Sequence, residues 1–97
     1  HIRQNYQHPL SLGELAALAG MNEQYFCRFF KKQFQMTPMT YINYYRTLQA
    51  ADLLRHSSLS VLEVGLRTGF ENPSYFAKTF RKYYNCSPAE YRKLSAF

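Results

Sequence analysis

The sequence predicts an all-α fold of six to seven helices, and two observations support this. No segment alternates between apolar and polar residues over a useful length, as a half-buried strand would. Residues typical of helix ends recur instead: serine, threonine or asparagine at starts, proline just inside some starts, and glycine at some stops. With 97 residues the chain makes at most one domain, which we take as residues 1–97.

One pattern of residues occurs twice, about fifty positions apart. In the first copy it comprises Ser11, Glu14, Gly20, Tyr25, Phe26, Phe30, Lys32, Pro38 and Tyr41, and in the second Ser60, Glu63, Gly69, Tyr75, Phe76, Phe80, Lys82, Pro88 and Tyr91. The offset is 49 up to the glycine and 50 after it, because the second copy contains one inserted residue. Repetition at this period indicates a duplicated supersecondary unit.

The first copy begins with a short helix that a glycine turn ends. Ser11 and Glu14 form a capping box, in which the serine oxygen accepts from an N–H of the first turn and the glutamate reaches back to the serine amide. A helix is therefore expected at about 12–19, ending where Gly20 adopts a positive φ. Its expected inward residues are Leu12, Leu15, Ala16 and Ala19.

Two longer helices follow, over 23–34 and 38–56. Asn22 is the candidate N-cap of the first, and Thr37-Pro38 marks the start of the second. Helical spacing places Phe26, Phe29, Phe30 and Gln33 on the inner side of 23–34, and Gln24, Cys27, Arg28 and Lys31 on its outer side. On 38–56 the inward pattern is Tyr41, Tyr45, Leu48, Ala51 and Leu54, which lets this helix pack against both copies.

The second copy repeats this order, with helices at 61–68 and 73–84 and a closing helix at 88–94. Ser60 and Ser87 begin capping boxes, Gly69 ends the short helix, and Asn72-Pro73 starts the longer one. The short helix turns Val61, Val64 and Gly65 inward; the longer one has Phe76, Thr79, Phe80 and Tyr83 inside and Ser74, Ala77, Lys78 and Arg81 outside. A remnant of an opening helix is expected near residues 2–6.

Each copy, 11–35 and 60–84, thus has the outline of a helix-turn-helix: a short helix, a tight turn and a longer helix. Both outer stripes carry small or amide residues first and basic residues later, with no acid on either. That layout suits a helix that enters the DNA major groove N-terminus first. The alternative is that any exposed amphipathic helix carries lysine and arginine.

Twelve Lys and Arg against six Asp and Glu give a net charge of +6, which fits a surface for a polyanion. A connecting helix over 38–56 spans about 28 Å, close to the roughly 34 Å between successive major grooves on one side of DNA. One chain would then read two adjacent grooves. Two other functions remain open: a basic helical module that binds an acidic protein, and a non-specific duplex binder.

Enzymatic, metal and membrane functions are not expected. The three histidines and two cysteines, Cys27 and Cys86, show no metal-ligand spacing, and no His–nucleophile pair or phosphate-cradling loop is present. No cofactor is therefore expected. The cysteines make no disulfide scaffold, which favours a reducing compartment such as the cytoplasm. No apolar run approaches the roughly 18 residues that span a membrane, and a start at His1 suggests a fragment of a longer protein.

The chain closely resembles the DNA-binding domain of AraC/XylS-type transcription regulators. The resemblance rests on LSLGELAALAGM, YFCRFFKK, TPMTYINYYRTLQAADLL and VLEVGLRTGFENPSYFAKTFRKYYNCSPAEYR, and covers Ser11–Lys93. It implies two helix-turn-helix units on a long helix that bind promoter DNA in bacteria, often as an activator that contacts RNA polymerase. Family members usually carry a sensing, dimerising or receiver domain ahead of this one.

By position, the family's groove-reading residues fall on Gln24, Cys27 and Arg28 in the first unit and on Pro73, Ser74 and Lys78 in the second. Arg28 is the strongest candidate for a base contact, since arginine binds guanine O6 and N7 bidentately; the alternative is a phosphate contact or a solvated charge. The expected phosphate contacts are Lys31, Lys32, Arg81 and Lys82, with solvated charge as the alternative for Lys32 and Lys82.

Two further positions carry expectations of their own. Gln35 stands where many members have glycine, which suggests a turn shaped differently from the one at Asn85. Arg46 on the connecting helix could be structural, paired with a carboxylate, or could touch the DNA backbone, and the structural role is favoured.

Overall fold

The computed structural model describes residues 2–95, and this range contains seven α-helices and no strand. In chain order they are α1 (Ile2–Asn5), α2 (Leu12–Leu18), α3 (Glu23–Phe34), α4 (Pro38–His56), α5 (Val61–Arg67), α6 (Pro73–Tyr84) and α7 (Pro88–Ser95). The predicted all-α fold is confirmed. His1, one of the histidines considered above, lies outside the described residues. No helix within 2–95 is both long and apolar enough to cross a membrane.

Side-chain caps begin the helices as expected. The Ser11 Oγ accepts from the Glu14 amide at 3.0 Å, and the Ser60 Oγ accepts from the Glu63 amide at 3.1 Å. The reciprocal bond, from the serine amide to the glutamate carboxylate, forms between Ser87 and Glu90 at 3.0 Å. In the described residues it does not form in the Ser11 and Ser60 boxes, where that part of the prediction is wrong; the Glu63 carboxylate accepts from Arg67 Nε at 3.0 Å. Arg67 lies four residues after Glu63 on the same helix, a spacing at which opposite charges attract each other.

Gly20 and Gly69 end α2 and α5 with positive φ angles of 71° and 98°. Both turns are Schellman motifs: Met21 N donates to Ala16 O at 2.9 Å, and Phe70 N donates to Gly65 O at 2.9 Å. The two turns differ in their surroundings. A Cβ on residue 20 would meet no atom within 4 Å, whereas one on residue 69 would lie 2.6 Å from Arg46 Nε.

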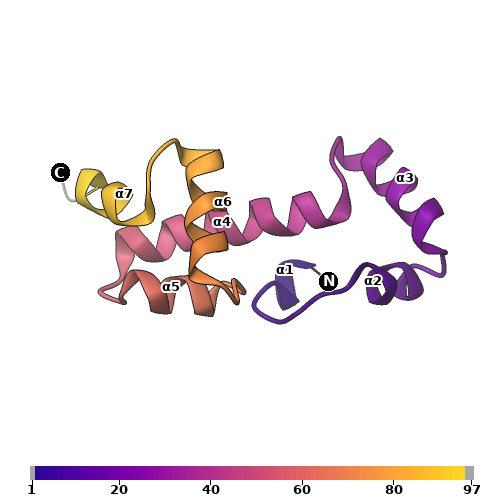
Figure 1. The fold of residues 1–97 in the computed structure, drawn as a ribbon. Coiled ribbons are helices and arrows are strands. Elements are labelled where there is room, and N and C mark those ends of the chain that lie inside the picture. Colours follow the sequence, from indigo (N-terminus) through magenta and orange to yellow (C-terminus); the bar gives the residue numbers. More distant parts are fainter. Residues whose placement is uncertain (1, 96–97) are drawn as a thin grey trace.

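The two units have separate cores, and α4 contributes to both. The first core contains Ile2, Leu15, Ala16, Phe26, Phe30 and Ile42, and the second contains Ala50, Ala51, Leu54, Val64, Phe70, Phe76 and Phe80. Figure 1 shows α2 and α3 at one end of α4 and α5, α6 and α7 around the rest of it. The molecule is elongated, with extents of 45 × 22 × 21 Å.

Several predicted inward positions are exposed. On α3, Phe29 is 41% exposed and Gln33 is also exposed, because α3 lies at the end of the molecule and only the side carrying Phe26 and Phe30 is covered. Ala19 is exposed after the end of α2. On α6, Tyr83 is only half-buried.

The buried stripe of α4 is also displaced from the predicted one. Leu48 is 37% exposed, and Tyr41 and Tyr45 are half-buried. The residues that are buried on α4 are Pro38, Ile42, Arg46, Thr47, Ala50, Ala51 and Leu54. The second half of the stripe, with Ala51 and Leu54, is as predicted, whereas in the first half Ile42 and Arg46 are buried in place of Tyr41 and Tyr45.

Candidate nucleic-acid interface

The outer face of α3 is anchored at its start by Asn22, whose Oδ1 accepts from the Tyr25 amide at 2.8 Å. Gln24 and Arg28 are exposed near this end, while Cys27 is half-buried. These three side chains, with Leu12 and Glu23, line an open depression of about 450 Å³ between α2 and α3. The structure therefore brings the three predicted groove-reading residues of the first unit together.

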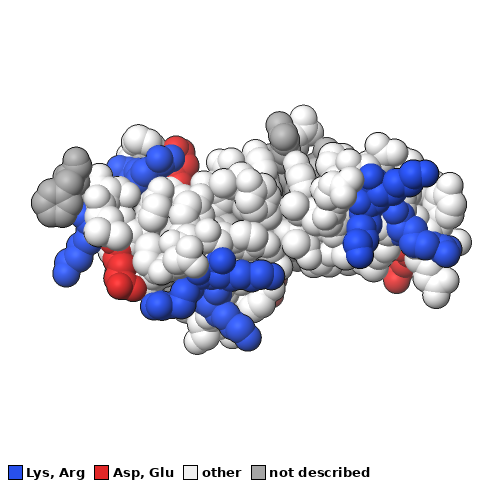
Figure 2. Space-filling view, turned by 90° about the horizontal axis from the view of Figure 1, so that it is seen from above, with Lys and Arg blue, Asp and Glu red and all other residues white. Residues whose placement is uncertain are grey.

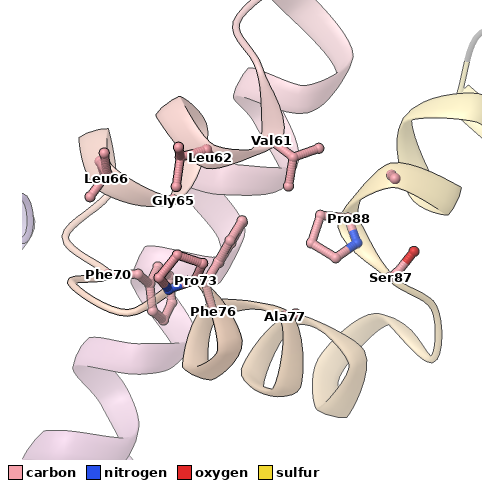
Figure 3. A pocket seen from close by; sticks show the side chains of 11 residues that line it. Val61, Leu62, Gly65, Leu66, Phe70, Pro73, Phe76, Ala77, Ser87 and Pro88 are labelled. Atoms are coloured by element: carbon pink, nitrogen blue, oxygen red, sulfur yellow. The ribbon is translucent and has the colours of Figure 1, made fainter.

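The outer face of α6 is built in the same way. Asn72 Oδ1 accepts from the amides of Ser74 at 2.8 Å and Tyr75 at 3.1 Å, so an asparagine side chain caps α6 as it does α3. Ser74 and Lys78 are exposed on this helix. Pro73 is exposed too, but it lines an apolar pocket of about 340 Å³ between α5, α6 and the start of α7 (Figure 3).

Basic side chains gather over α3 and over α6. Figure 2 shows one group of Lys and Arg at the end that carries α3 and another over the part that carries α6, with uncharged surface between them. Lys31 and Lys32 lie in the last turn of α3, and Arg81 and Lys82 lie in the last turn of α6. All four are exposed.

One acid reaches the basic face of α6 from another helix. Glu90 of α7 lies 3.4 Å from Arg81 Nη2. The backbone N–H of Ser87 donates to the Glu90 carboxylate at 3.0 Å, and this bond, followed by the Ser87 hydroxyl and the Arg81 charge, lowers the pKa of Glu90. α6 itself carries no acid on its outer stripe, as expected, but its neighbour supplies one.

The two long helices end in the same way, contrary to the expectation at Gln35. Gln35 has φ 64° and ψ 17°, and Asn85 has φ 61° and ψ 19°. Each donates its amide to a carbonyl four residues earlier at 2.8 Å, Lys31 O and Arg81 O respectively. Glutamine is thus held in the left-handed region that asparagine adopts more readily.

Arg46 is structural, as predicted, but its partners are carbonyl oxygens rather than a carboxylate. It is 8% exposed, and it donates from Nε to Tyr6 O at 2.7 Å and from Nη2 to His8 O at 2.9 Å. Burial lowers the pKa of Arg46, and the charge of Glu71 acts in the opposite direction.

Sequence reasoning missed Arg92, which makes the corresponding bonds in the second unit. Arg92 donates to Leu54 O at 3.1 Å and to Ser57 O at 3.4 Å. Two of the acceptor residues, His8 and Ser57, are related by the repeat offset of 49 positions. The donors Arg46 and Arg92 are 46 positions apart, so the repeat does not pair them and does not identify Arg92 from the sequence.

The aromatic rings are divided between the two cores and the surface. Among residues 2–95, five phenylalanines and three tyrosines lie in or against the two cores, and Tyr84 stacks on Phe80 with centroids 4.7 Å apart, while Tyr44 is 37% exposed. Cys27 and Cys86 are free thiols. Within residues 2–95, no group of three or more His, Cys, Asp or Glu side chains is arranged to hold a metal ion.

Residues 15–94 match a family described as a helix-turn-helix domain. The chain is 37% identical over 92 residues to an uncharacterized HTH-type transcriptional regulator of Haemophilus influenzae, covering 95% of this chain and 31% of that protein. It is 35% identical over 94 residues to the melibiose operon regulatory protein of Escherichia coli, covering 97% of this chain and 31% of the relative. The chain therefore spans about a third of the length of these relatives.

Two solved structures share the fold over nearly the whole chain. An AraC-type DNA-binding domain-containing transcriptional regulator from Chromobacterium violaceum is 30% identical, with a TM-score of 0.88, over 98% of this chain and 85% of that one. The DNA-binding domain of AdpA, a global transcriptional factor solved in complex with a target DNA, is 34% identical, with a TM-score of 0.91, over 94% of this chain and 82% of that one.

Proposed function

Because the chain belongs to the AraC-type family of helix-turn-helix transcription regulators, we propose that it binds double-stranded promoter DNA in a sequence-specific manner and thereby regulates transcription. The observation that carries this proposal is the pair of exposed, basic helices, α3 and α6, held by matching caps and turns. The likeness to a domain whose structure includes its target DNA supports it.

In this proposal α3 and α6 enter successive major grooves of one DNA duplex. Base edges are read by residues near the helix starts: Gln24, Cys27 and Arg28 on α3, and Pro73, Ser74 and Lys78 on α6. Arg28 has the strongest chemistry for this role, because its forked guanidinium matches guanine O6 and N7. Cys27 is half-buried and Pro73 lines an apolar pocket, so these two contribute shape and apolar contact.

Phosphate contacts are assigned to the basic residues of the last turns. Lys31, Lys32 and Lys82 present exposed ammonium groups, and the guanidinium of Arg81 is exposed but paired with Glu90. Such contacts release counterions from DNA and make affinity depend steeply on salt. On binding, Arg81 would exchange the Glu90 carboxylate for a phosphate.

The relatives are about three times as long as this chain, which supports a further sensing or dimerising domain in the whole protein. Family resemblance supports a regulator that acts in the bacterial cytoplasm, as an activator that contacts RNA polymerase. These features of the whole protein are proposals alongside DNA binding.

Selection of binding sites from random duplexes tests the function. The expected product is an asymmetric site with two different elements about one helical turn apart. Titration of that site against salt should give a steep fall in affinity. Loss of all sequence preference in competitor DNA would leave a non-specific duplex binder, and binding only to an acidic protein would overturn the proposal.

A further inference from the structure

A short stretch of α4 contacts both α3 and α6. Tyr41 packs on Phe30 of α3 with ring centroids 5.5 Å apart. Two residues later, Asn43 Nδ2 donates to the Tyr75 hydroxyl of α6 at 2.8 Å, and Tyr44 packs edge-on against Tyr83 of α6 at 5.5 Å. This stretch of α4 therefore links α3 to α6 near the middle of the molecule, where Figure 1 shows α6 crossing α4.

Arg46 lies one turn further along α4 and joins three segments. Its guanidinium donates to the carbonyls of Tyr6 and His8, which belong to the segment leading into the first unit. The same group packs on the Gly69 turn of the second unit, where a Cβ would lie 2.6 Å from Nε. Tyr6 also packs edge-on against Tyr45 with centroids 5.2 Å apart.

Arg92 provides the natural comparison. It too donates to two carbonyls at the end of the helix that precedes a helix-turn-helix, Leu54 O and Ser57 O. Both acceptors are next to the second core, and Arg92 itself is on α7 of that unit. Arg92 thus fastens a unit to its own preceding helix, whereas Arg46 also touches the other unit.

We propose that Arg46 is a positioning residue for DNA recognition: it holds the turn of the second unit against the segment that leads into the first, and so sets the distance and rotation between α3 and α6. The DNA site must match that geometry. This inference rests on the proposed function for its consequence in DNA binding, but its structural part stands on the free protein.

The first test uses the free protein and no DNA. Residual dipolar couplings of backbone amides report the orientation of α3 relative to α6. In the unmodified chain and in Arg92→Met, one alignment tensor should fit both units; in Arg46→Met, two tensors should be required. Circular dichroism confirms that each variant is helical. A single tensor for Arg46→Met would overturn the structural part of the proposal, whatever the chain binds.

The second test uses duplexes recovered by the selection described above, with base pairs inserted between the two elements. Two added base pairs rotate one element by about 70° around the DNA axis. We expect this insertion to weaken binding of the unmodified chain and of Arg92→Met at least about tenfold, but that of Arg46→Met less than about threefold. An undiminished spacing penalty in Arg46→Met, with affinity lowered equally on every duplex, would reduce Arg46 to a stabilising residue.

Two outcomes separate this inference from the function on which it rests. If the unmodified chain selects no sequence, the proposed function fails, while the couplings still decide the role of Arg46 in the free protein. If Arg46→Met does not fold, Arg46→Lys replaces it in both tests. Lysine keeps the charge but lacks the fork that reaches two carbonyls at once, so the same results are expected and the same results contradict the proposal.

Discussion

At the scale of single residues, the proposed base contacts and the proposed phosphate contacts of α3 lie at different positions along the helix. Gln24 and Arg28 lie in its first half, where an entering helix meets base edges, and Lys31 and Lys32 lie in its last turn. Base contacts carry sequence preference, whereas phosphate contacts fix position and add affinity to every sequence. Single substitutions at these positions should therefore give different signatures.

Replacing Arg28 by alanine should weaken binding to the selected site by about 1–3 kcal/mol and relax the preference at one base pair. The reason is the loss of a bidentate contact to guanine that no neighbouring side chain replaces. Lys31→Ala is the matched control and should weaken binding to all duplexes alike, with a shallower salt dependence. An equal loss on all sequences for Arg28→Ala would make Arg28 a phosphate contact.

The two turn glycines allow a second comparison between residues. Both Gly20→Ala and Gly69→Ala place a Cβ at positive φ, which costs roughly 1–2 kcal/mol. Only at position 69 does that Cβ also collide with Arg46 and the Tyr6 carbonyl. We expect Gly69→Ala to lower the free energy of unfolding by at least about 1 kcal/mol more than Gly20→Ala does, as measured by urea denaturation. Equal losses of unfolding free energy in the two variants would show that the Arg46 side chain moves aside without cost.

At the scale of helices, starts and stops were predictable because their causes are local. A serine or asparagine cap, a proline inside the first turn and a glycine at positive φ act within four residues of one another. The predicted bounds of α3, α4 and α6 accordingly match the structure, and those of α2, α5 and α7 differ by one residue.

Which side of a helix becomes covered was less predictable, because it depends on residues far away in the chain. Phe29 has the spacing of a core residue, yet no element covers that side of α3. Arg46 has the chemistry of a surface residue, yet two carbonyl oxygens from the segment before α2 allow its burial. A buried cation is tolerated when its donors are satisfied in this way.

The start of α7 is the helix end with the clearest dependence on pH. Hydrogen bonds from Ser87 lower the pKa of Glu90 below its ordinary value of 4.5 in the folded chain. A group with a depressed folded pKa stabilises the fold above its unfolded pKa, and that stabilisation is lost as the pH falls through the folded value. Glu90→Gln should therefore flatten the fall in unfolding free energy on acidification.

Ser87→Ala is the control for this prediction. It removes the hydroxyl cap and should cost about 1 kcal/mol near neutral pH. It leaves the backbone N–H of residue 87, which is the first cause of the lowered pKa of Glu90. Most of the pH dependence should therefore persist in Ser87→Ala. Its complete loss in that variant, measured by denaturation over acidic pH, would assign the effect to the hydroxyl.

At the scale of the whole molecule, the two units share their scaffold but differ in the exposed residues near the start of α3 and of α6, which we call the tips of these helices. Caps, turns and core phenylalanines recur in both units, but Gln24, Cys27 and Arg28 have Ser74, Ala77 and Lys78 as their counterparts 50 positions later. The α4 helix is expected to hold the two units apart over a length of about 28 Å. Along it, α6 contacts Asn43 and Tyr44 and shares a core with Ala50, Ala51 and Leu54.

Different tips on matching scaffolds explain why one chain should read an asymmetric site. The tips are exposed or half-buried in both units, so they can be exchanged without touching either core. Figure 1 shows α3 and α6 running in the same general direction, from a start near the short helix of their unit to an end near the opposite side of α4. Two identical tips should therefore read two elements in the same orientation.

This leads to a prediction about the triple variant Ser74→Gln, Ala77→Cys and Lys78→Arg, which gives α6 the tip of α3. Selection from random duplexes should return a direct repeat of the element that α3 reads, at the unchanged spacing, because Arg46 and the α4–α6 contacts remain in place. Lys82→Ala is the control: it should lower affinity without changing the selected sequence. Recovery of the original second element by the triple variant would show that α6 reads bases through other residues, and an inverted repeat would contradict the parallel arrangement of the two helices.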